Sequence, residues 1–260
     1  MDNLSRICVS TWSFHTLFET PAPETGKRME ALDFPEMVAD RYGVHNVEIV
    51  FPHLSSNEPS YLEEFNARLR KAHSRVVNVP VDWAELWEKP SISSGDPKER
   101  EHAISLYQKG IDVAAAIGSP AARCDPGKVN LGEPSITIDS YRTLVSYAKA
   151  KGVAIVVENH GGISRNPEVL VEILKASGAA ALPDIGNFPD EQTRERGLRL
   201  LFPLAGGISH AKLDPRFDLI KYLRIAGDAG YQGVYSIEAG DRTDPYAAVQ
   251  QILDVLVQEL

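Results

Sequence analysis

The chain has 260 residues, of which 43% are hydrophobic, and its formal net charge is −9. This length allows a buried core without disulfides, and the acidic balance disfavours nucleic acid as a partner, because phosphates require clustered Lys and Arg. No apolar run approaches the ~18 residues that span a membrane, and residues 1–6 lack the pattern of a signal peptide. We therefore expect a cytoplasmic protein with neither a membrane nor a nucleic-acid partner.

Eight short apolar segments are typical of β-strands buried on both faces. Such segments, rich in Val and Ile, belong to parallel sheets that helices cover. The expected strands are residues 7–13, 46–51, 75–81, 121–124, 153–162, 180–184, 206–211 and 233–238.

Helical segments alternate with these strands. Their ranges are 34–42, 61–73, 98–117, 138–150, 167–177, 190–201, 217–229 and 244–259. Gly43, Gly118, Gly178 and Gly230 follow four of them, as expected of C-terminal caps. Eight alternating units of about 32 residues each predict an α/β fold, a single (β/α)₈ TIM barrel that covers residues 1–260 as one domain.

The connections expected after strands are longer than those before them. In a TIM barrel these long loops lie over the C-terminal rim, where lids and specificity elements are placed. Trp12, Trp83 and Trp87 occur at or beyond strand ends, where flat rings suit the faces of sugars. The spacing of Trp83 and Trp87 also fits the plain packing of a small helix.

Four metal-competent side chains end the last four expected strands. Glu158, Asp184, His210 and Glu238 are separated by 26, 26 and 28 residues, the length of one strand, one helix and two loops. They should therefore meet at one rim of the barrel. Three carboxylates and an imidazole suit Mn²⁺ or Mg²⁺, and Co²⁺, Fe²⁺ or Zn²⁺ also fit. Since three clustered acids without a cation would be costly, we expect one divalent cation.

Several nearby residues are candidates for substrate binding. Residues two apart on a strand share a face, so His160 and Lys212 should point inward with Glu158 and His210. His160 could line the pocket or orient a ligand. Lys212 could neutralise an oxyanion or balance the acidic ligands.

Two further residues have two interpretations each. Arg216 could contact a substrate hydroxyl or carboxylate, or lie at an ordinary surface position. Glu48 ends the second strand and could contact substrate or form an internal ion pair. Cys8 and Cys124 are expected to be reduced core thiols rather than catalytic groups. The glycine pairs at 161–162 and 206–207 do not form a dinucleotide fingerprint and indicate close backbone approach.

The chain resembles the xylose isomerase-like TIM barrel superfamily in two features: the quartet of Glu158, Asp184, His210 and Glu238, and the spacing His210-x-Lys212-x-x-x-Arg216. Within it, the resemblance is to the sugar phosphate isomerase/epimerase family, which includes D-tagatose 3-epimerase-like enzymes. It implies that the quartet holds one cation, often Mn²⁺, that Glu158 and Glu238 also move protons, and that the protein is a homodimer or homotetramer. These epimerases usually bind substrate with a histidine three residues after the strand-6 aspartate. Asn187 occupies that position here.

The expected activity is that of a divalent-metal-dependent isomerase or epimerase acting on a small-molecule carbohydrate. The cation polarises a carbonyl, one glutamate removes the adjacent proton, and the other returns a proton to the cis-enediolate. Return to the same carbon gives epimerisation, and return to its neighbour gives isomerisation.

Other functions are also compatible with the sequence. The same enolate could expel a β-substituent, as in a lyase or dehydratase acting on a keto-sugar or a dehydroshikimate-like acid, and Arg216 and Asn187 leave this open. A non-catalytic sugar-binding barrel is the plainest alternative. An abasic-site endonuclease would need further histidines and a basic surface. The loop at 239–245, with two acids beside Arg242, favours an unphosphorylated sugar.

Overall fold

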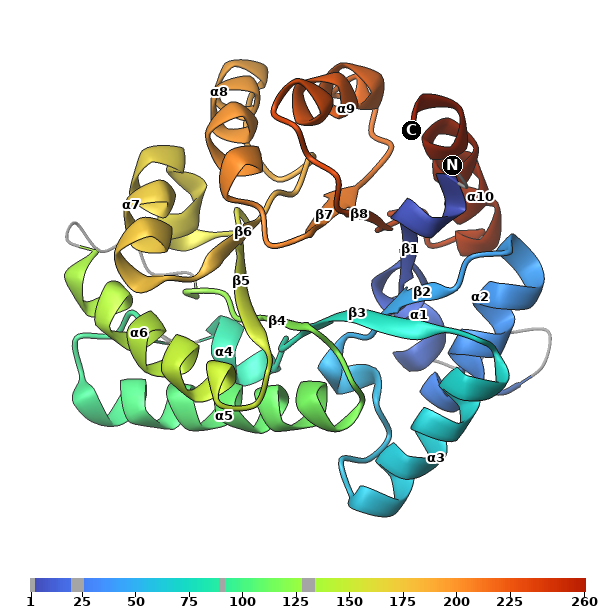
Figure 1. Ribbon diagram of the computed structural model, residues 1–260, viewed down its shortest axis with the longest axis horizontal. Helices are drawn as coiled ribbons and strands as arrows, with labels where there is room; N and C mark the ends of the chain where they lie inside the picture. Colours follow the sequence, from blue (N-terminus) through green and yellow to red (C-terminus); the bar gives the residue numbers. More distant parts are fainter. Residues whose placement is uncertain (1–2, 20–25, 89–91, 128–133) are drawn as a thin grey trace.

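A parallel eight-stranded sheet forms a barrel at the centre of the computed structural model (Figure 1), which describes residues 3–19, 26–88, 92–127 and 134–260. The strand order is β6-β5-β4-β3-β2-β1-β8-β7. The strands are β1 (Ile7–Ser10), β2 (Asn46–Glu48), β3 (Arg75–Pro80), β4 (Ala121–Arg123), β5 (Ala154–Glu158), β6 (Ala180–Leu182), β7 (Ile208–Ala211) and β8 (Val234–Ile237). The predicted TIM barrel is confirmed.

The barrel closes where β6 meets β7, through isolated bridges rather than a regular ladder. One bridge joins Ala181 to Ala205, and the other joins Asp184 to His210. The backbone N–H of His210 donates to the carbonyl of Pro183 at 3.0 Å, and that of Ile185 donates to the carbonyl of His210 at 3.2 Å. This junction therefore brings two of the predicted ligands onto adjacent strand ends.

All eight predicted helices are present, and each begins and ends within three residues of its expected position. They are α2 (Phe34–Tyr42), α3 (Pro59–Lys71), α5 (Pro97–Ala116), α6 (Ser135–Lys149), α7 (Pro167–Ser177), α8 (Glu191–Leu201), α9 (Leu219–Asp228) and α10 (Pro245–Glu259). Gly43 and Gly178 cap α2 and α7 with φ of 65° and 81°, the left-handed region that glycine enters without steric cost.

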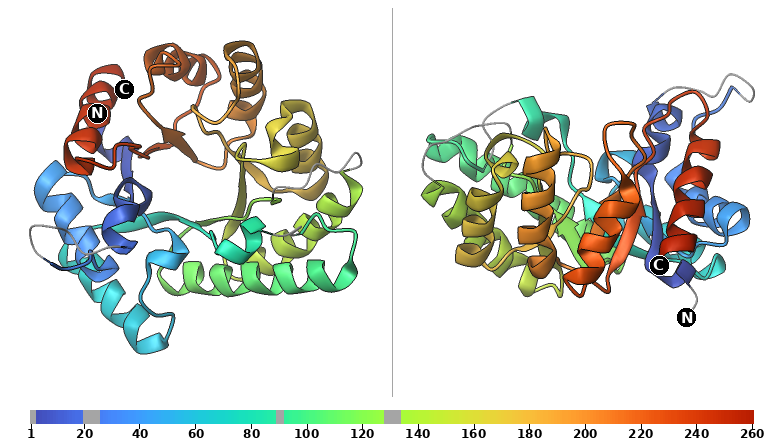
Figure 2. Two further views of the ribbon diagram at one scale, coloured as in Figure 1. Left: turned by 180° about the vertical axis from the view of Figure 1, so that it is seen from behind. Right: turned by 90° about the horizontal axis from the view of Figure 1, so that it is seen from above.

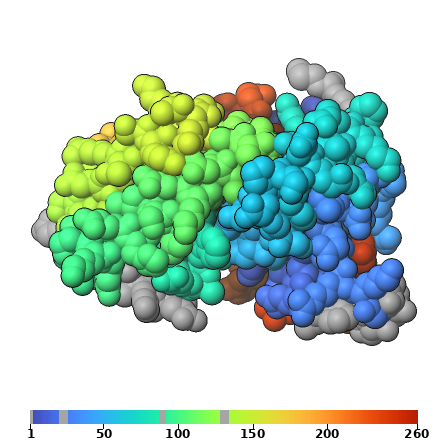
Figure 3. Space-filling view, turned by 90° about the horizontal axis from the view of Figure 1, so that it is seen from below, coloured from blue at the N-terminus to red at the C-terminus, as the bar shows by residue number. Residues whose placement is uncertain are grey.

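The helices form a ring outside the strands, and the two ends of the chain meet in it (Figure 2). Asn3 donates a side-chain hydrogen bond to the carbonyl of Val257 in α10 at 2.9 Å. Figure 3 shows one outer face, on which the green residues of α5 lie between a yellow-green segment and the blue and cyan segments from the first third of the chain.

Short helices occupy several loops and ends. The α-helices are α1 (His15–Glu19) and α4 (Ala84–Glu88); the 3₁₀ helices are η1 (Asn3–Arg6), η2 (Thr11–Phe14), η3 (Ala31–Asp33), η4 (Phe51–His53), η5 (Gly162–Arg165) and η6 (Phe202–Leu204). β1 and β2 are shorter than predicted because η2 and η4 follow them. Ser10 accepts from the N–H of Trp12, and Thr11 accepts from the N–H of Val50. Such side-chain acceptors compete with the strand ladder.

The core has two parts. Most buried apolar residues lie in one large cluster, whereas the smaller cluster takes one residue from each of six strands: Cys8, Val77, Ala121, Val156, Leu182 and Ile208. One residue per strand is the pattern of side chains that fill a barrel interior. Cys8 and Cys124 are buried and unpaired, as predicted. Within the described ranges, no helix has the length and apolar character to cross a membrane.

Gly206→Ala should lower the free energy of unfolding by about 1–3 kcal/mol, because a well-packed core resists an added methyl group. The new Cβ would lie 2.6 Å from Val156 Cγ1 and 2.9 Å from Ala180 Cβ. Gly227→Ala in α9, where the Cβ meets nothing within 4 Å, is the control and should stabilise by about 0.5–1 kcal/mol. Denaturant unfolding measures both, and equal effects would contradict the close approach at Gly206.

Candidate metal centre and pocket

Three of the four predicted ligands, the carboxylates, surround one atom of the fourth, Nδ1 of His210. This nitrogen lies 3.4 Å from Asp184 Oδ2, 3.4 Å from Glu238 Oε1 and 3.6 Å from Glu158 Oε1. His210 and Asp184 are fully buried, and the two glutamates are almost so. His210 comes from β7, while the carboxylates come from the ends of β5, β6 and β8. The spacing in the sequence thus corresponds to a real cluster at the C-terminal rim.

Nδ1 of His210 makes no hydrogen bond with any described residue, although it is buried. Buried polar atoms nearly always have a partner, so an unpartnered one among three carboxylate oxygens needs an explanation. One oxygen from each carboxylate and this nitrogen provide four donors of the types that divalent cations take from proteins. The residues present therefore fit a bound divalent cation.

Glu48 lies on the other side of the His210 ring. Its carboxylate is fully buried, 3.2 Å from Nε2 of His210, and it also accepts a hydrogen bond from Asn78 at 2.9 Å. A carboxylate in this place fixes the orientation of a histidine whose other nitrogen binds a metal. Of the two interpretations of Glu48, the internal ion pair is the one that its contacts match.

Lys212 bridges two of the carboxylates. Its Nζ lies 2.7 Å from Asp184 Oδ2, 2.9 Å from Glu238 Oε2 and 3.5 Å from Asn187 Oδ1. Burial lowers the pKa of Lys212, but Asp184 and Glu238 outweigh it and raise the pKa above its ordinary value. These contacts match a side chain that balances the acidic cluster.

A buried guanidinium on the opposite side was not predicted. Arg123, at the end of β4 and only 3% exposed, forms ion pairs with Asp82, Asp125 and Glu158. Burial raises the pKa of Glu158, but Arg123 and two histidines outweigh it and hold the pKa well below its usual range. The pKa of Glu238 is raised, chiefly by its burial.

His160 and Asn187 complete the surroundings of Glu158. Nδ1 of His160 lies 3.4 Å from Asp125 Oδ2 and 3.7 Å from Glu158 Oε2, and Asn187 donates to Glu158 Oε1 at 2.6 Å. Burial lowers the pKa of His160, but Glu158 and Asp125 outweigh it and raise the pKa to about 9. Asn187 is itself fixed by its backbone N–H, which donates to Asp184 at 2.9 Å.

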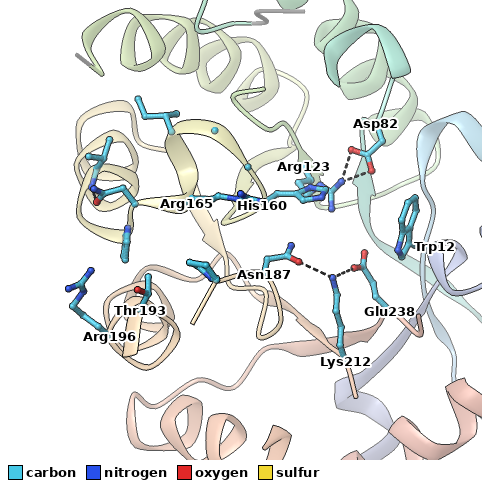
Figure 4. Close-up of a pocket in the computed structure, with 17 residues that line it drawn as sticks. Trp12, Asp82, Arg123, His160, Arg165, Asn187, Thr193, Arg196, Lys212 and Glu238 are labelled. Carbon is cyan, nitrogen blue, oxygen red and sulfur yellow. Dashed lines mark hydrogen bonds and ion pairs between the residues drawn. The ribbon is translucent and has the colours of Figure 1, made fainter. Parts of the chain in front are cut away.

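The predicted ligands and their neighbours lie beside a pocket of about 1420 Å³ (Figure 4). Its lining includes Trp12, His160, Asn187, Lys212 and Glu238, all of which the sequence singled out. Trp12 is 39% exposed and stacks on His15 at 4.6 Å between ring centroids. A half-exposed flat ring at the mouth of a pocket suits contact with an apolar sugar face.

A family comparison agrees with this architecture. The sequence pattern of the xylose isomerase-like TIM barrel family matches residues 38–205. The chain belongs to that family. A comparison with curated proteins gave no match.

Several solved structures have the same fold and align with almost the whole length of this chain. D-psicose 3-epimerase with D-tagatose, from Clostridium cellulolyticum H10, has 15% identity and a TM-score of 0.72, covering 98% of this chain and 99% of its own. D-allulose 3-epimerase from Methylomonas sp. has 15% identity and a TM-score of 0.74, covering 98% of each chain. A xylose isomerase-like TIM barrel protein from Mycobacterium smegmatis in complex with magnesium has 17% identity and a TM-score of 0.67, covering 98% and 97%. At these identities the likeness shows the fold of this xylose isomerase-like barrel.

Two sequence candidates lie away from the pocket. Arg216 is 69% exposed and its guanidinium is paired with Asp214 at 2.7 Å, which matches the surface interpretation. Trp83 is partly buried and packs against Phe51 at 4.9 Å between centroids, which matches the packing interpretation. The side chain of Trp87 lies outside the described residues. Neither Arg216 nor Trp83 is among the described residues that line the pocket.

Arg123, Asp82 and Asp125 could have been found from the sequence. Asp82 follows β3 and Asp125 follows β4, which is the same placement at strand ends that identified the quartet. Arg123 interrupts an otherwise apolar strand, and a charged residue there must be paired if it is buried. Both carboxylates directly follow expected strands, those at 75–81 and 121–124.

Arg123→Ala should lower the free energy of unfolding by about 3–5 kcal/mol, because removal of one partner leaves buried carboxylates without compensation. Arg142→Ala is the matched control. Arg142 pairs with Asp139 on the surface of α6, and loss of such a pair should cost at most about 1 kcal/mol. Urea unfolding followed by circular dichroism measures both variants, and similar losses would show that the buried ion pairs contribute no more than a surface pair.

Proposed function

We propose that this chain is a divalent-metal-dependent sugar isomerase or epimerase, with Glu158, Asp184, His210 and Glu238 as ligands of one cation. The unpartnered Nδ1 of His210, among three carboxylate oxygens at 3.4–3.6 Å, is the observation that carries this proposal. The epimerases and the magnesium complex among the similar solved structures support it. Mn²⁺ and Mg²⁺ suit a set dominated by carboxylates best.

The reaction requires proton transfer beside a carbonyl. A divalent cation at this centre would polarise the substrate carbonyl and so acidify the adjacent C–H bond. Glu158 and Glu238 approach from β5 and β8 and are the two groups that accept and return the proton. Return to the same carbon inverts it, and return to the neighbouring carbon isomerises the sugar.

The two glutamates are held by different cationic side chains. Glu158 is fixed by Arg123 through Oε2 and by Asn187 through Oε1, whereas Glu238 is fixed by Lys212 through Oε2. Groups held in one place act with less reorganisation during the reaction. Asn187 thus takes part in the site by orienting Glu158, and Trp12 forms a wall for the sugar.

The lyase or dehydratase alternative loses one of its two supports. It depended on Arg216 as a contact for a substrate carboxylate, and Arg216 instead pairs with Asp214 on the surface. A homodimer or homotetramer and a cytoplasmic location stay predictions from the sequence.

Asp184→Ala and His210→Ala should each abolish metal binding, because an incomplete set of donors binds a cation weakly. The wild-type chain should hold close to one ion after chelation and reconstitution, measured by elemental analysis. Asp241→Ala, which removes an exposed rim carboxylate, is the control and should keep the ion. A wild-type value near zero or near three ions per chain would contradict the proposed centre.

Glu158→Gln and Glu238→Gln should retain metal and lose turnover by about 10²–10⁴-fold, because glutamine keeps a carbonyl oxygen but cannot accept a proton. With Mg²⁺ bound, exchange of the substrate C–H with D₂O, followed by NMR, should persist for the epimer that faces the surviving glutamate. Glu195→Gln on the surface of α8 serves as the control. Turnover within about tenfold of wild type in both variants would rule out the two-glutamate mechanism.

A further inference from the structure

The pocket extends well beyond the metal-ligand cluster, toward the beginnings of α7 and α8. Its volume of about 1420 Å³ exceeds the range of about 300–1000 Å³ that is usual for small-molecule sites. The lining residues of this outer end are Arg165, Asn166, Pro167, Val169, Pro189, Thr193 and Arg196. In Figure 4, Thr193 and Arg196 lie across the pocket from Trp12 and Glu238. A monosaccharide bound at the cluster would leave this end unfilled.

The outer end differs from the inner end in charge. The two acids that line the inner end, Asp82 and Glu238, are each paired with a cation, Arg123 and Lys212. The described residues that line the outer end include two arginines and no carboxylate. This concentration of positive charge occurs in a chain whose formal net charge is −9.

The two arginines have donors available. Arg165, the last residue of η5, is exposed, and its guanidinium has no hydrogen bond or ion pair with any residue in the described part of the chain. Arg196 uses Nε to pair with Glu168 Oε1 at 3.1 Å, and its terminal nitrogens have no described partner. Glu168 and Asp190 each offset part of the charge of Arg196, and Glu168 also holds its side chain. Guanidinium groups bind phosphate and carboxylate oxygens through paired N–H donors.

Two helix ends lie at the outer end of the pocket. Asn166 and Pro167 begin α7, and Thr193 lies in the first turn of α8; all three line the pocket. The N-terminal end of a helix carries a partial positive charge that favours anions. The first free N–H groups of α7 are already bound by Asn166, and the N–H of Thr193 in α8 is bound by the carboxylate of Asp190, which offsets the partial charge of that helix end. The donors therefore come from the arginines.

We propose that the outer end of the pocket binds an anionic group, a phosphate or a carboxylate, that the carbohydrate substrate carries. Arg165 and Arg196 are its contacts. The assignment to a carbohydrate rests on the proposed function, whereas the anion site itself does not. The loop at 239–245, which favoured an unphosphorylated sugar, belongs to the other side of the rim and does not supply these contacts.

Thermal unfolding tests the anion site without the need for a known substrate. Inorganic phosphate and D-glucuronate are titrated against wild-type protein at constant pH and ionic strength, with chloride as the reference, both with and without Mg²⁺. A ligand that binds the folded state raises Tm with its concentration and so gives a Kd. We expect a saturable rise with at least one of the two anions, and the anion with the lower Kd identifies phosphate or carboxylate as the group.

The Arg165→Ala/Arg196→Ala double variant should weaken anion binding at least tenfold. Arg199→Ala is a close control, because Arg199 lies on the same helix, is 54% exposed as Arg196 is, and pairs with Glu195 as Arg196 pairs with Glu168, but does not line the pocket. It should leave the Kd unchanged. All three substituted side chains are exposed, so the variants should fold.

Three results would overturn the anion site. They are the absence of a saturable shift in the wild type, a shift that the double variant retains, and a shift that requires Mg²⁺ and therefore reports an anion on the cation. Failure of the proposed isomerase activity would be seen separately, in the metal stoichiometry and the proton exchange of the glutamate variants, and would leave the phosphate titration unaffected.

Discussion

The rest of the site depends on the pairing of carboxylates that the barrel buries at its C-terminal rim. Glu48, Asp125, Glu158, Asp184 and Glu238 are all nearly or fully buried. Removing such charges from water costs several kcal/mol each unless opposite charges and hydrogen bonds compensate. Arg123 compensates on one side, Lys212 on the other, and His210 between them. Nδ1 of His210 lies among three of these carboxylates without a hydrogen bond to any described residue, which is the position that the proposed cation would share.

The same constraint links the site to the closure of the barrel. β6 and β7 are joined by isolated bridges, one of which pairs Asp184 with His210. Seven pairs of neighbouring strands form hydrogen-bonded ladders, and the eighth junction carries two of the proposed ligands. A cation held by these two side chains would connect the strands where backbone pairing is weakest. The proposed chemistry of the site would then fix the geometry of this junction together with the sheet.

The sequence predicted the barrel and the quartet because both follow from spacing along the chain. A repeat of about 26 residues places each strand end at the same rim, so Glu158, Asp184, His210 and Glu238 could be grouped without knowledge of any contact. Contacts between distant loops carry no such period. Spacing cannot tell which exposed guanidinium faces the pocket, so it singles out Arg216, which does not line the pocket, and not Arg165, which does. The partners of Arg123 could not be chosen for the same reason.

The charge of the whole chain and that of the pocket act over different distances. A net charge of −9 repels an anion far from the protein, but screening at physiological salt reduces that effect beyond about 8 Å. Arg165 and Arg196 would act within that distance, on a group that has already entered the pocket. They would therefore contribute to the selection and orientation of a bound molecule more than to the speed of its arrival. Because the acids that line the inner end are paired with cations and two arginines line the outer end, the two ends would recognise different parts of one substrate.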